Sequence, residues 1–390
     1  MILENTEIAY QSKTTKELKK GIFIFKLFRF PWIMEIGGKL TLLFLKWGWP
    51  LPSLVKSLIY KQFCGGENES EAQKVIQDLA TYDVNSCVHH AAEDIPTEAG
   101  RTAVLDRFID ILQFSKQNKS FTFSVIKPTG LGAPVLFEKV SAGKVLTPEE
   151  SKQWKLLQER FQFCCDQAFQ FNTKLLVDAE ESWYQNGIDQ LLEPLMLNYN
   201  KKMAHVFTTL QMYRIDRIEY LEKLLLMAKN NKIIVGIKLV RGAYLSKEKE
   251  YATSKGIPSV ICPTKEATDA NFETALQFIL THIAHFALFL GSHNEQNVLQ
   301  TMMFMKKHHI EPNHPHIYFS QLYGMSDHLT FNLAHHGFQA LKYIPYGRVE
   351  EAIPYLLRRV KENTAVMSQS KRELDLYQKE LQRRYSTAAL

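Results

Sequence analysis

Short apolar runs alternate with longer amphipathic segments along most of the chain, from about residue 84 onward. The short runs are rich in the branched and aromatic residues that favour strands. We predict eight strands, at residues 84–91, 122–127, 174–180, 205–213, 233–240, 286–293, 317–323 and 340–346. Between them apolar positions recur with a helical period. This period predicts helices at residues 104–117, 151–172, 182–198, 213–230, 266–285, 295–309 and 326–338.

This alternation predicts an α/β fold. Eight strand–helix units favour a closed (βα)8, TIM-like barrel over an open parallel sheet. The nearly continuous apolar strands are typical of a parallel sheet that helices cover on its outside. We expect an N-terminal helical arm at residues 1–70, the barrel at 71–365 and a polar C-terminal helix at 366–390.

The segment YLLRRVKEN, residues 355–363, raises a question about two adjacent arginines. At about 100° per residue, one helix face collects Ile353, Leu356, Leu357 and Val360, and the opposite face collects Tyr355, Arg358, Arg359 and Glu362. The polar face could be solvated, with an Arg358–Glu362 pair at i,i+4. It could instead face a ligand, because it follows directly on the last predicted strand and barrel enzymes bind ligands at strand ends.

Polar residues recur at the carboxyl ends of the predicted strands: Lys127, Asp178, Gln211, Lys238, Arg241, Tyr244, Ser292, His293, Asn294, Gln321 and Tyr343. Several cations around one barrel mouth suit a ligand with phosphate or carboxylate groups. Each residue also has a plainer interpretation: Lys127 as a surface charge, Asp178 as a helix N-cap, His293 as a core histidine. Adjacent histidine pairs and an odd cysteine count without C-x-x-C give no metal site and no disulfide framework.

The formal charge of +6 comes from the first 62 residues, where ten lysines and arginines face four glutamates. This arm is also rich in phenylalanine and tryptophan, but charges interrupt every window long enough to span a bilayer. Two interpretations stay open: peripheral contact with an anionic membrane surface, or a helical cap packed on the barrel. The rest of the chain is balanced in charge, and we expect no nucleic-acid partner.

Several segments together resemble the proline dehydrogenase family. They are KLVRGAYL (238–245), VDAEES (177–182), YIPYG (343–347) and YLLRRVKEN (355–363), with GSHNEQN (291–297) and SQLYGM (320–325) as further matches. The resemblance covers about residues 85–380. It implies a distorted (βα)8 barrel that binds FAD, oxidises L-proline to Δ1-pyrroline-5-carboxylate and passes electrons to a membrane quinone.

The resemblance also implies roles for individual residues. Arg358 and Arg359 would bind the proline carboxylate, with Lys127 assisting. Tyr343 and Tyr355 would wall the proline ring, with Leu322 as an apolar contact, and Asp178 would orient the site. The FAD-lining positions would be Ala179, Gln211, Arg241, Gly242, Ala243, Tyr244, Ser292, His293, Asn294 and Gln321. Many members have RLVK where this chain has KLVR, so either Lys238 or Arg241 would approach flavin N5.

Two alternatives to this function stay open. One is a barrel lyase or aldolase that uses Lys127 or Lys238 as a Schiff-base amine. The other is a non-catalytic protein that binds a membrane surface. For the main hypothesis we expect a cytoplasmic enzyme in peripheral contact with the inner face of the membrane through residues 1–62, because no Arg-rich, acid-poor leader is evident.

Overall fold

The computed structural model describes residues 2–28, 30, 37–38, 40–41, 43–44, 47, 49, 60–91, 95, 97–116, 118–362 and 364–388. Within these ranges it leaves out the side chains of residues 2, 28, 354, 358–362 and 364–370. Arg358 and Arg359 therefore belong to a described helix, but their side chains lie outside the described part of the structure.

Eight parallel strands close into a barrel in the order of the sequence. They are β1 (Asn85–His90), β2 (Phe121–Ile126), β3 (Lys174–Val177), β4 (Val206–Gln211), β5 (Val235–Val240), β6 (Phe286–Gly291), β7 (Ile317–Leu322) and β8 (Ala340–Tyr346). β1 pairs with β8 from Asn85↔Leu341 to His90↔Tyr346, which closes the ring. The predicted (βα)8 barrel is confirmed. β3 ends three residues earlier than predicted, so Asp178 begins the following loop.

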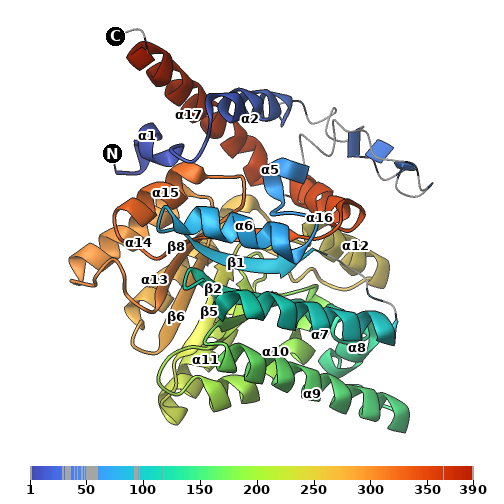
Figure 1. The fold of residues 1–390 in the computed structure, drawn as a ribbon. Helices are drawn as coiled ribbons and strands as arrows, with labels where there is room; N and C mark the ends of the chain where they lie inside the picture. Colours follow the sequence, from blue (N-terminus) through green and yellow to red (C-terminus); the bar gives the residue numbers. More distant parts are fainter. Residues whose placement is uncertain are drawn as a thin grey trace.

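Helices surround the barrel (Figure 1). Those predicted are present as α7 (Glu98–Gln113), α9 (Pro148–Gln170), α10 (Ser182–Tyr199), α11 (Arg217–Asn231), α13 (Lys265–Thr281), α14 (Glu295–Lys307) and α15 (Asp327–His335). Three further helices escaped the prediction: α6 (Glu69–Ala80), α8 (Pro134–Ser141) and α12 (Leu245–Lys255). α12 has a single buried residue, Glu248, and therefore no apolar stripe that a helical period could reveal.

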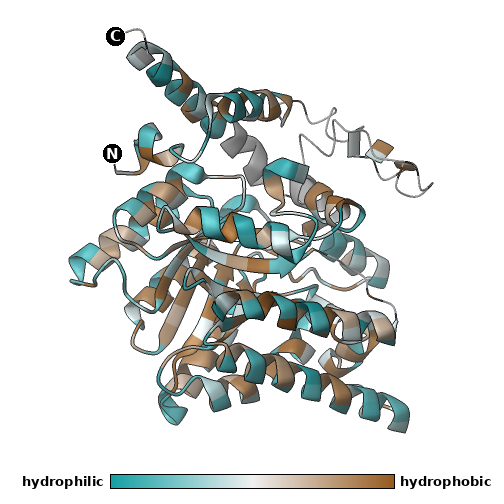
Figure 2. Ribbon diagram, viewed as in Figure 1, coloured by the Kyte–Doolittle hydropathy of each residue, from teal (hydrophilic) through white to brown (hydrophobic). Residues whose placement is uncertain are grey.

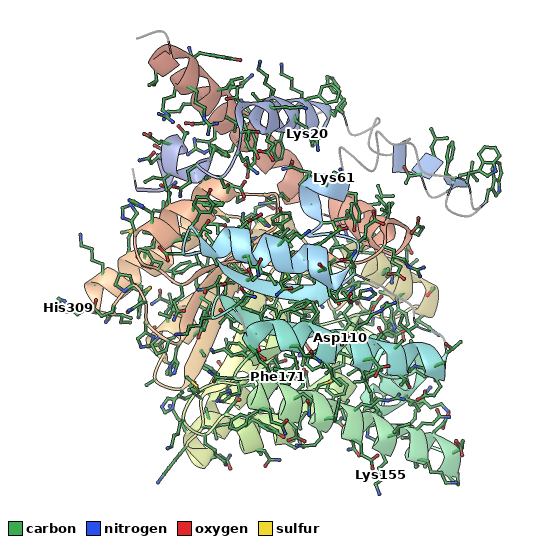
Figure 3. All side chains as sticks on the ribbon, viewed as in Figure 1. Lys20, Lys61, Asp110, Lys155, Phe171 and His309 are labelled. Carbon is green, nitrogen blue, oxygen red and sulfur yellow. The ribbon has the colours of Figure 1, made fainter. Side chains whose placement is uncertain are left out.

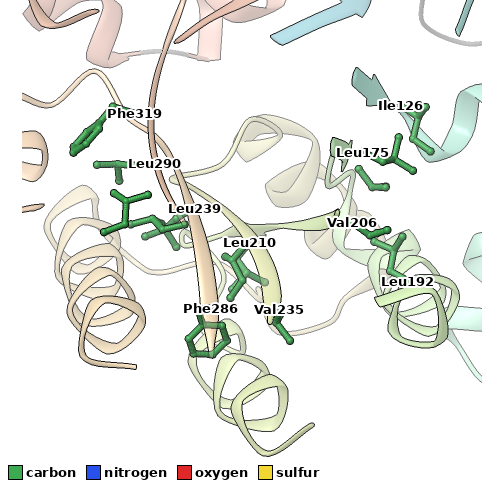
Figure 4. Packing of buried hydrophobic residues seen from close by; sticks show 14 of the residues in the cluster. Ile126, Leu175, Leu192, Val206, Leu210, Val235, Leu239, Phe286, Leu290 and Phe319 are labelled. Atoms are coloured by element: carbon green, nitrogen blue, oxygen red, sulfur yellow. The ribbon is translucent and has the colours of Figure 1, made fainter. Parts of the chain in front are cut away.

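Strand residues alternate between two cores. Outward-facing residues such as Leu175, Val206 and Val235 pack under the helices, as Figure 4 shows for part of this layer. Inward-facing residues fill the barrel, where the Phe123 ring meets the rings of Phe207 and Phe289 edge to face. Figure 2 shows the same layering: the strands are mostly hydrophobic (brown), and the helices around them also carry hydrophilic residues (teal). The next inward positions toward the carboxyl ends are polar, so the packed core stops where a ligand site can begin.

The two ends of the described chain meet on the barrel (Figure 1). The N-terminal arm contains η1 (Ile2–Glu4), α1 (Thr6–Ala9), α2 (Thr15–Phe28) and α5 (Lys61–Phe63), and the C-terminal part contains α16 (Val349–Glu362) and α17 (Thr364–Ala388). α2 packs against α17, with Gly21 and Phe25 against the Tyr377 ring. The Arg384 guanidinium donates to the backbone carbonyls of Tyr10 and Lys13.

The described arm thus packs as a helical cap, but the cap keeps charges on its surface. Lys20 of α2 and Lys61 of α5 lie close enough that burial together with the Lys61 charge lowers the pKa of Lys20 (Figure 3). Among the described residues, every helix is too short or too polar to span a bilayer.

Candidate active site

Asp178 lies at the centre of the barrel mouth, directly after β3. Its Oδ1 is 2.6 Å from Nζ of Lys238 on β5, and its Oδ2 accepts a 2.8 Å hydrogen bond from the Tyr343 hydroxyl on β8. Burial, the largest single cause, would raise the pKa of Asp178, but the Lys238 charge together with the neighbouring His89 and the hydrogen bonds from Lys238 and Tyr343 brings the pKa to about 2. Asp178 is therefore ionised. It is not a helix N-cap, because α10 begins at Ser182 behind Glu181.

The two cations of KLVR point to different places. Nζ of Lys238 lies 4.3 Å from the centre of the Tyr343 ring, on the inner side of the mouth. The Arg241 guanidinium turns outward, where its Nε is 2.6 Å from Oδ1 of Asp269 on α13 and its NH2 is 3.1 Å from Oδ1 of Asn297. Lys238 thus belongs to the inner part of the site and Arg241 to the outer part.

Helix α16 lies with Tyr355 toward the barrel mouth. The Tyr355 side chain is buried, its ring is 5.1 Å from Nζ of Lys127, and it meets the imidazole of His89 edge to face. Lys127 is half-buried here and is not a freely exposed surface charge. By the helical period, positions 358 and 359 fall on the same face of α16 as Tyr355.

A cavity of about 530 Å³ opens from this mouth. All ten positions expected to line FAD lie along it: Ala179, Gln211, Arg241, Gly242, Ala243, Tyr244, Ser292, His293, Asn294 and Gln321. Asp178, Lys238, Leu322 and Tyr343 also line it, so the expected substrate and cofactor residues share one space. Lys127 and Tyr355 do not line this space; Tyr355 reaches it through His89, which contacts both Tyr355 and the cavity-lining Tyr343.

Gln211 and Gly242 shape the floor of the cavity. The Gln211 amide donates to the Glu180 carbonyl (2.7 Å) and accepts from the Ala243 backbone N–H (3.1 Å), so one side chain joins the loops after β3 and β5. Gly242 has φ +132°, and a Cβ there would overlap the Tyr213 ring. Only glycine lets the chain run this close to Tyr213 and leave the cavity open.

Glu180 follows Asp178 by two residues, but its pKa shifts in the opposite direction. Burial raises the pKa of Glu180 to about 8, and the Thr129 hydroxyl, which donates to it at 2.7 Å, only partly opposes this. Among the described residues, its carboxylate accepts hydrogen bonds from the backbone N–H and the hydroxyl of Thr129, and neither of these groups is a cation. The site therefore holds an ionised Asp178 beside a Glu180 that is largely protonated at neutral pH.

Three groups of site residues were missed from the sequence. The outer cavity contains Lys249 of α12, Lys265 of α13 and Arg372 of α17, all of which resemble ordinary surface charges in sequence. His328 and Glu295 form an ion-pair cluster there with Arg372. His89 lies beside the inner mouth. In the sequence its adjacency to His90 argued against a metal site, but it did not show which of the two side chains points into the barrel.

Comparisons with known proteins agree with this geometry. Residues 72–372 match the family model described as proline dehydrogenase. The chain is 29% identical to proline dehydrogenase 1, mitochondrial, of Dictyostelium discoideum, covering 97% of this chain and 74% of that protein. It is 31% identical to the carbapenem antibiotics biosynthesis protein CarD of Pectobacterium carotovorum, covering 84% of this chain and 85% of that protein.

Solved structures show the same fold in larger proteins. Proline utilization A (PutA) from Bdellovibrio bacteriovorus, inactivated by N-propargylglycine, superposes with a TM-score of 0.70 at 20% identity, over 78% of this chain. PutA from Corynebacterium freiburgense gives 0.67 at 21% identity, over 87% of this chain. The chain spans only about a third of either PutA chain, 33% and 34%.

Proposed function

We propose, from the premise that this chain belongs to the proline dehydrogenase family of oxidoreductases, that it oxidises L-proline to Δ1-pyrroline-5-carboxylate with FAD as the hydride acceptor. The observation that carries the proposal is the Asp178–Lys238–Tyr343 cluster, which opens directly into the large cavity. A small acidic substrate and a dinucleotide would use the inner and outer parts of that one space.

The residues around the cavity fit a flavin dinucleotide. The volume, about 530 Å³, lies within the usual range for ligand sites. Its outer part offers Arg241, Lys249, Lys265 and Arg372 to phosphate groups, and Gln211 and Gln321 offer amide groups further in. The flavin, when bound, supplies a two-electron acceptor for the hydride. The chain supplies binding, orientation and charge.

The inner residues bind and orient the substrate in this proposal. The guanidinium groups of Arg358 and Arg359, with Lys127, hold the carboxylate, and a bidentate guanidinium fixes the direction of the ring. Tyr343 and Tyr355 wall the ring, and Leu322 contacts its apolar edge. The observed Tyr355–Lys127 contact supports this arrangement, since it puts both beside the same mouth.

Asp178 acts as the organising carboxylate, since it holds Lys238 and the Tyr343 hydroxyl at fixed positions. Lys238, and not Arg241, is the cation assigned to the reacting end of the substrate, because Lys238 lies beside Tyr343 on the inner side of the mouth, whereas Arg241 turns outward toward Asp269. Cations around the substrate amine disfavour its protonated form and lower its pKa in the site. The neutral amine then keeps the lone pair that assists hydride loss from the ring carbon.

The test begins with the colour of the purified protein. After saturation with FAD, we expect a flavin absorption band in the visible blue that bleaches anaerobically on addition of L-proline. Bleaching by another cyclic amino acid but not by proline would overturn the assignment of proline as substrate. Absence of flavin binding would reject the proposal and favour the lyase or the non-catalytic alternative, which need no flavin.

We further propose that the electrons pass to a lipid-soluble quinone and that the basic, aromatic arm keeps the enzyme at a membrane. Exposed Phe23 (50%), Trp47 (56%) and Trp49 (54%) support this proposal, because exposed aromatic rings beside lysines suit a headgroup layer. The cytoplasmic location remains a prediction, since several relatives are named as mitochondrial.

Substitutions suit this second test better than truncation, because removal of residues 1–62 would uncover α17. We expect full-length protein to co-sediment with vesicles rich in anionic lipid, and Phe23→Ser with Trp47→Ser and Trp49→Ser to reduce that binding. Exposed Val145→Ser, far along the chain, serves as the matched control. Equal vesicle binding by all variants would reject the membrane role of the arm.

A further inference from the structure

His89 is a buried histidine that packs against Tyr343 and Tyr355 beside the inner mouth, next to but outside the residues that line the cavity, and the proposed chemistry has no use for it so far. It lies on β1, two residues beyond the inward-facing Cys87, so its side chain also points into the barrel. Only 3% of the residue is exposed. Its imidazole centre is 4.7 Å from that of Tyr343 and 5.1 Å from that of Tyr355, the two rings assigned to the substrate wall.

The backbone fixes the tautomer of this imidazole. Nδ1 of His89 lies 3.1 Å from the carbonyl oxygen of His90. A carbonyl oxygen only accepts hydrogen bonds, so Nδ1 must carry the proton. In the neutral ring Nε2 is then an acceptor with a free lone pair. Nε2 is buried and has no hydrogen-bond partner among the described residues, which is unfavourable for a buried polar atom.

The surroundings keep the ring neutral. Burial, with smaller contributions from the Lys127 and Lys238 charges, lowers the pKa of His89 to about 3, although Asp178 opposes this shift. The groups that face it are Lys127 after β2, Asp178 after β3, Lys238 on β5, Tyr343 on β8 and Tyr355 on α16. Lys238 and Tyr343 already donate to Asp178. Nε2 therefore remains an acceptor at any physiological pH.

We propose that Nε2 of His89 accepts a hydrogen bond from the amine N–H of the bound substrate, which makes His89 a residue that selects cyclic secondary amines over isosteres without that hydrogen. The inference rests on the proposed function and deepens it. Neutral proline with an ionised carboxylate has one hydrogen-bond donor, its N–H. A bond from this hydrogen to Nε2 leaves the nitrogen lone pair free, whereas a lysine or arginine would donate to that lone pair and occupy it.

The test compares two ligands in one variant. In tetrahydrofuran-2-carboxylate a ring oxygen replaces the N–H, so this ligand keeps the carboxylate and the ring shape but has no donor. We expect His89→Leu to lower kcat/KM for L-proline by about tenfold or more. Binding of tetrahydrofuran-2-carboxylate, measured from the change in the flavin spectrum, should stay the same or tighten. His89→Gln, whose amide oxygen can accept, should recover part of the proline activity.

The matched control is His90→Leu. The His90 imidazole points out of the barrel toward Arg107 and Glu351. His90→Leu should therefore leave the wild-type relation between kcat/KM for L-proline and the affinity for tetrahydrofuran-2-carboxylate unchanged. If His89→Leu weakens both ligands equally, His89 only packs against the tyrosines and the inference is wrong. If the wild-type holoenzyme fails to oxidise proline, the proposed function itself is wrong, and that outcome is separate from any effect of His89.

Discussion

Two buried aspartates in this molecule, Asp178 and Asp327, have similarly lowered pKa values but different surroundings. Asp178 lies between Lys238 and Tyr343, and Asp327, at the start of α15, lies between Lys342 of β8 (2.7 Å) and Lys13 of the arm (3.1 Å). In both, burial would raise the pKa but the cations bring it to about 2. Each ion pair therefore adds stability that is present above about pH 4 and is lost as the pH falls toward 2.

The difference lies in what surrounds each pair. Asp178 lines the cavity, so its partners can meet a ligand. Asp327 joins three segments that are distant in the sequence, and Lys342 also donates to the Met325 carbonyl, which leaves this cluster closed on itself. A perturbed pKa thus marks a buried charge, and only the adjoining cavity distinguishes a candidate site from a structural joint.

The largest expected effect is a loss of stability when the structural ion pairs of Asp327 are broken. Asp327→Asn leaves the buried Lys342 and the half-buried Lys13 without their carboxylate partner, so the free energy of unfolding should fall by about 3–5 kcal/mol. Urea denaturation measures this, and Lys13→Met provides a milder variant if Asp327→Asn does not fold. The kcat of the folded fraction at low temperature should stay close to wild type. A large loss of kcat with unchanged stability would break the comparison.

Asp178→Asn should instead lower the activity much more than the stability. Without the carboxylate, Lys238 and the Tyr343 hydroxyl lose their common anchor, and misplacement of site groups by about 1 Å can lower the rate on the order of 100-fold. Steady-state kinetics with L-proline measure this as kcat/KM, beside the unfolding curve of the same sample. An activity loss no larger than that of Asp327→Asn would contradict the assignment of Asp178 to the site.

The two arginines of α16 extend the comparison to charges expected to meet the ligand. Arg358→Lys or Arg359→Lys replaces a planar fork by a point charge, so proline binding should weaken by about 1–3 kcal/mol with stability nearly unchanged. Arg348→Lys is the control, because Arg348 starts the same helix but is exposed and paired with Glu351. Unchanged KM in both arginine variants would refute the carboxylate clamp.

The smallest expected effect is the pH dependence that Glu180 gives to the free energy of unfolding. Because its pKa is raised from 4.5 to about 8, the folded protein binds the extra proton, and this contribution to stability is lost as the pH rises through 8. Glu180→Gln has no such proton. From pH 7 to pH 9, wild type should lose about 1.4 kcal/mol relative to the variant, as one pKa unit requires. Parallel unfolding curves at both pH values would show that Glu180 does not titrate in this way.

Much of the fold follows from the sequence because strand alternation is local. Eight apolar runs separated by helical periods leave few topologies, and parallel strands necessarily bring their carboxyl-end residues to one rim. This is why the sequence alone groups Asp178, Lys238 and Tyr343 at one rim. α12 escaped prediction because its few apolar residues, among them Leu245 and Ala252, form no continuous stripe, and the residue that it buries is Glu248.

The pairing of these residues could not be predicted in the same way. Arg241 and Lys238 stand three positions apart in one motif, yet one binds Asp269 of a later helix and the other binds Asp178. Asp269 looks like a solvated helix charge in sequence. Likewise, the Lys13–Asp327–Lys342 joint depends on how the arm folds back onto the barrel, which no local pattern encodes.

The contact between α2 and α17 also has a consequence in time. Nearly the whole barrel lies between these helices in the sequence, so α2 leaves the ribosome long before its partner exists. At ordinary synthesis rates the delay is roughly tens of seconds. Throughout that interval Leu18, Ile24 and Phe25, all buried in the finished protein, have no partner helix to cover them. One of the first helices made is therefore among the last to dock, and a nascent chain of this protein exposes an apolar, basic segment that chaperones or a membrane surface can reach before the barrel closes.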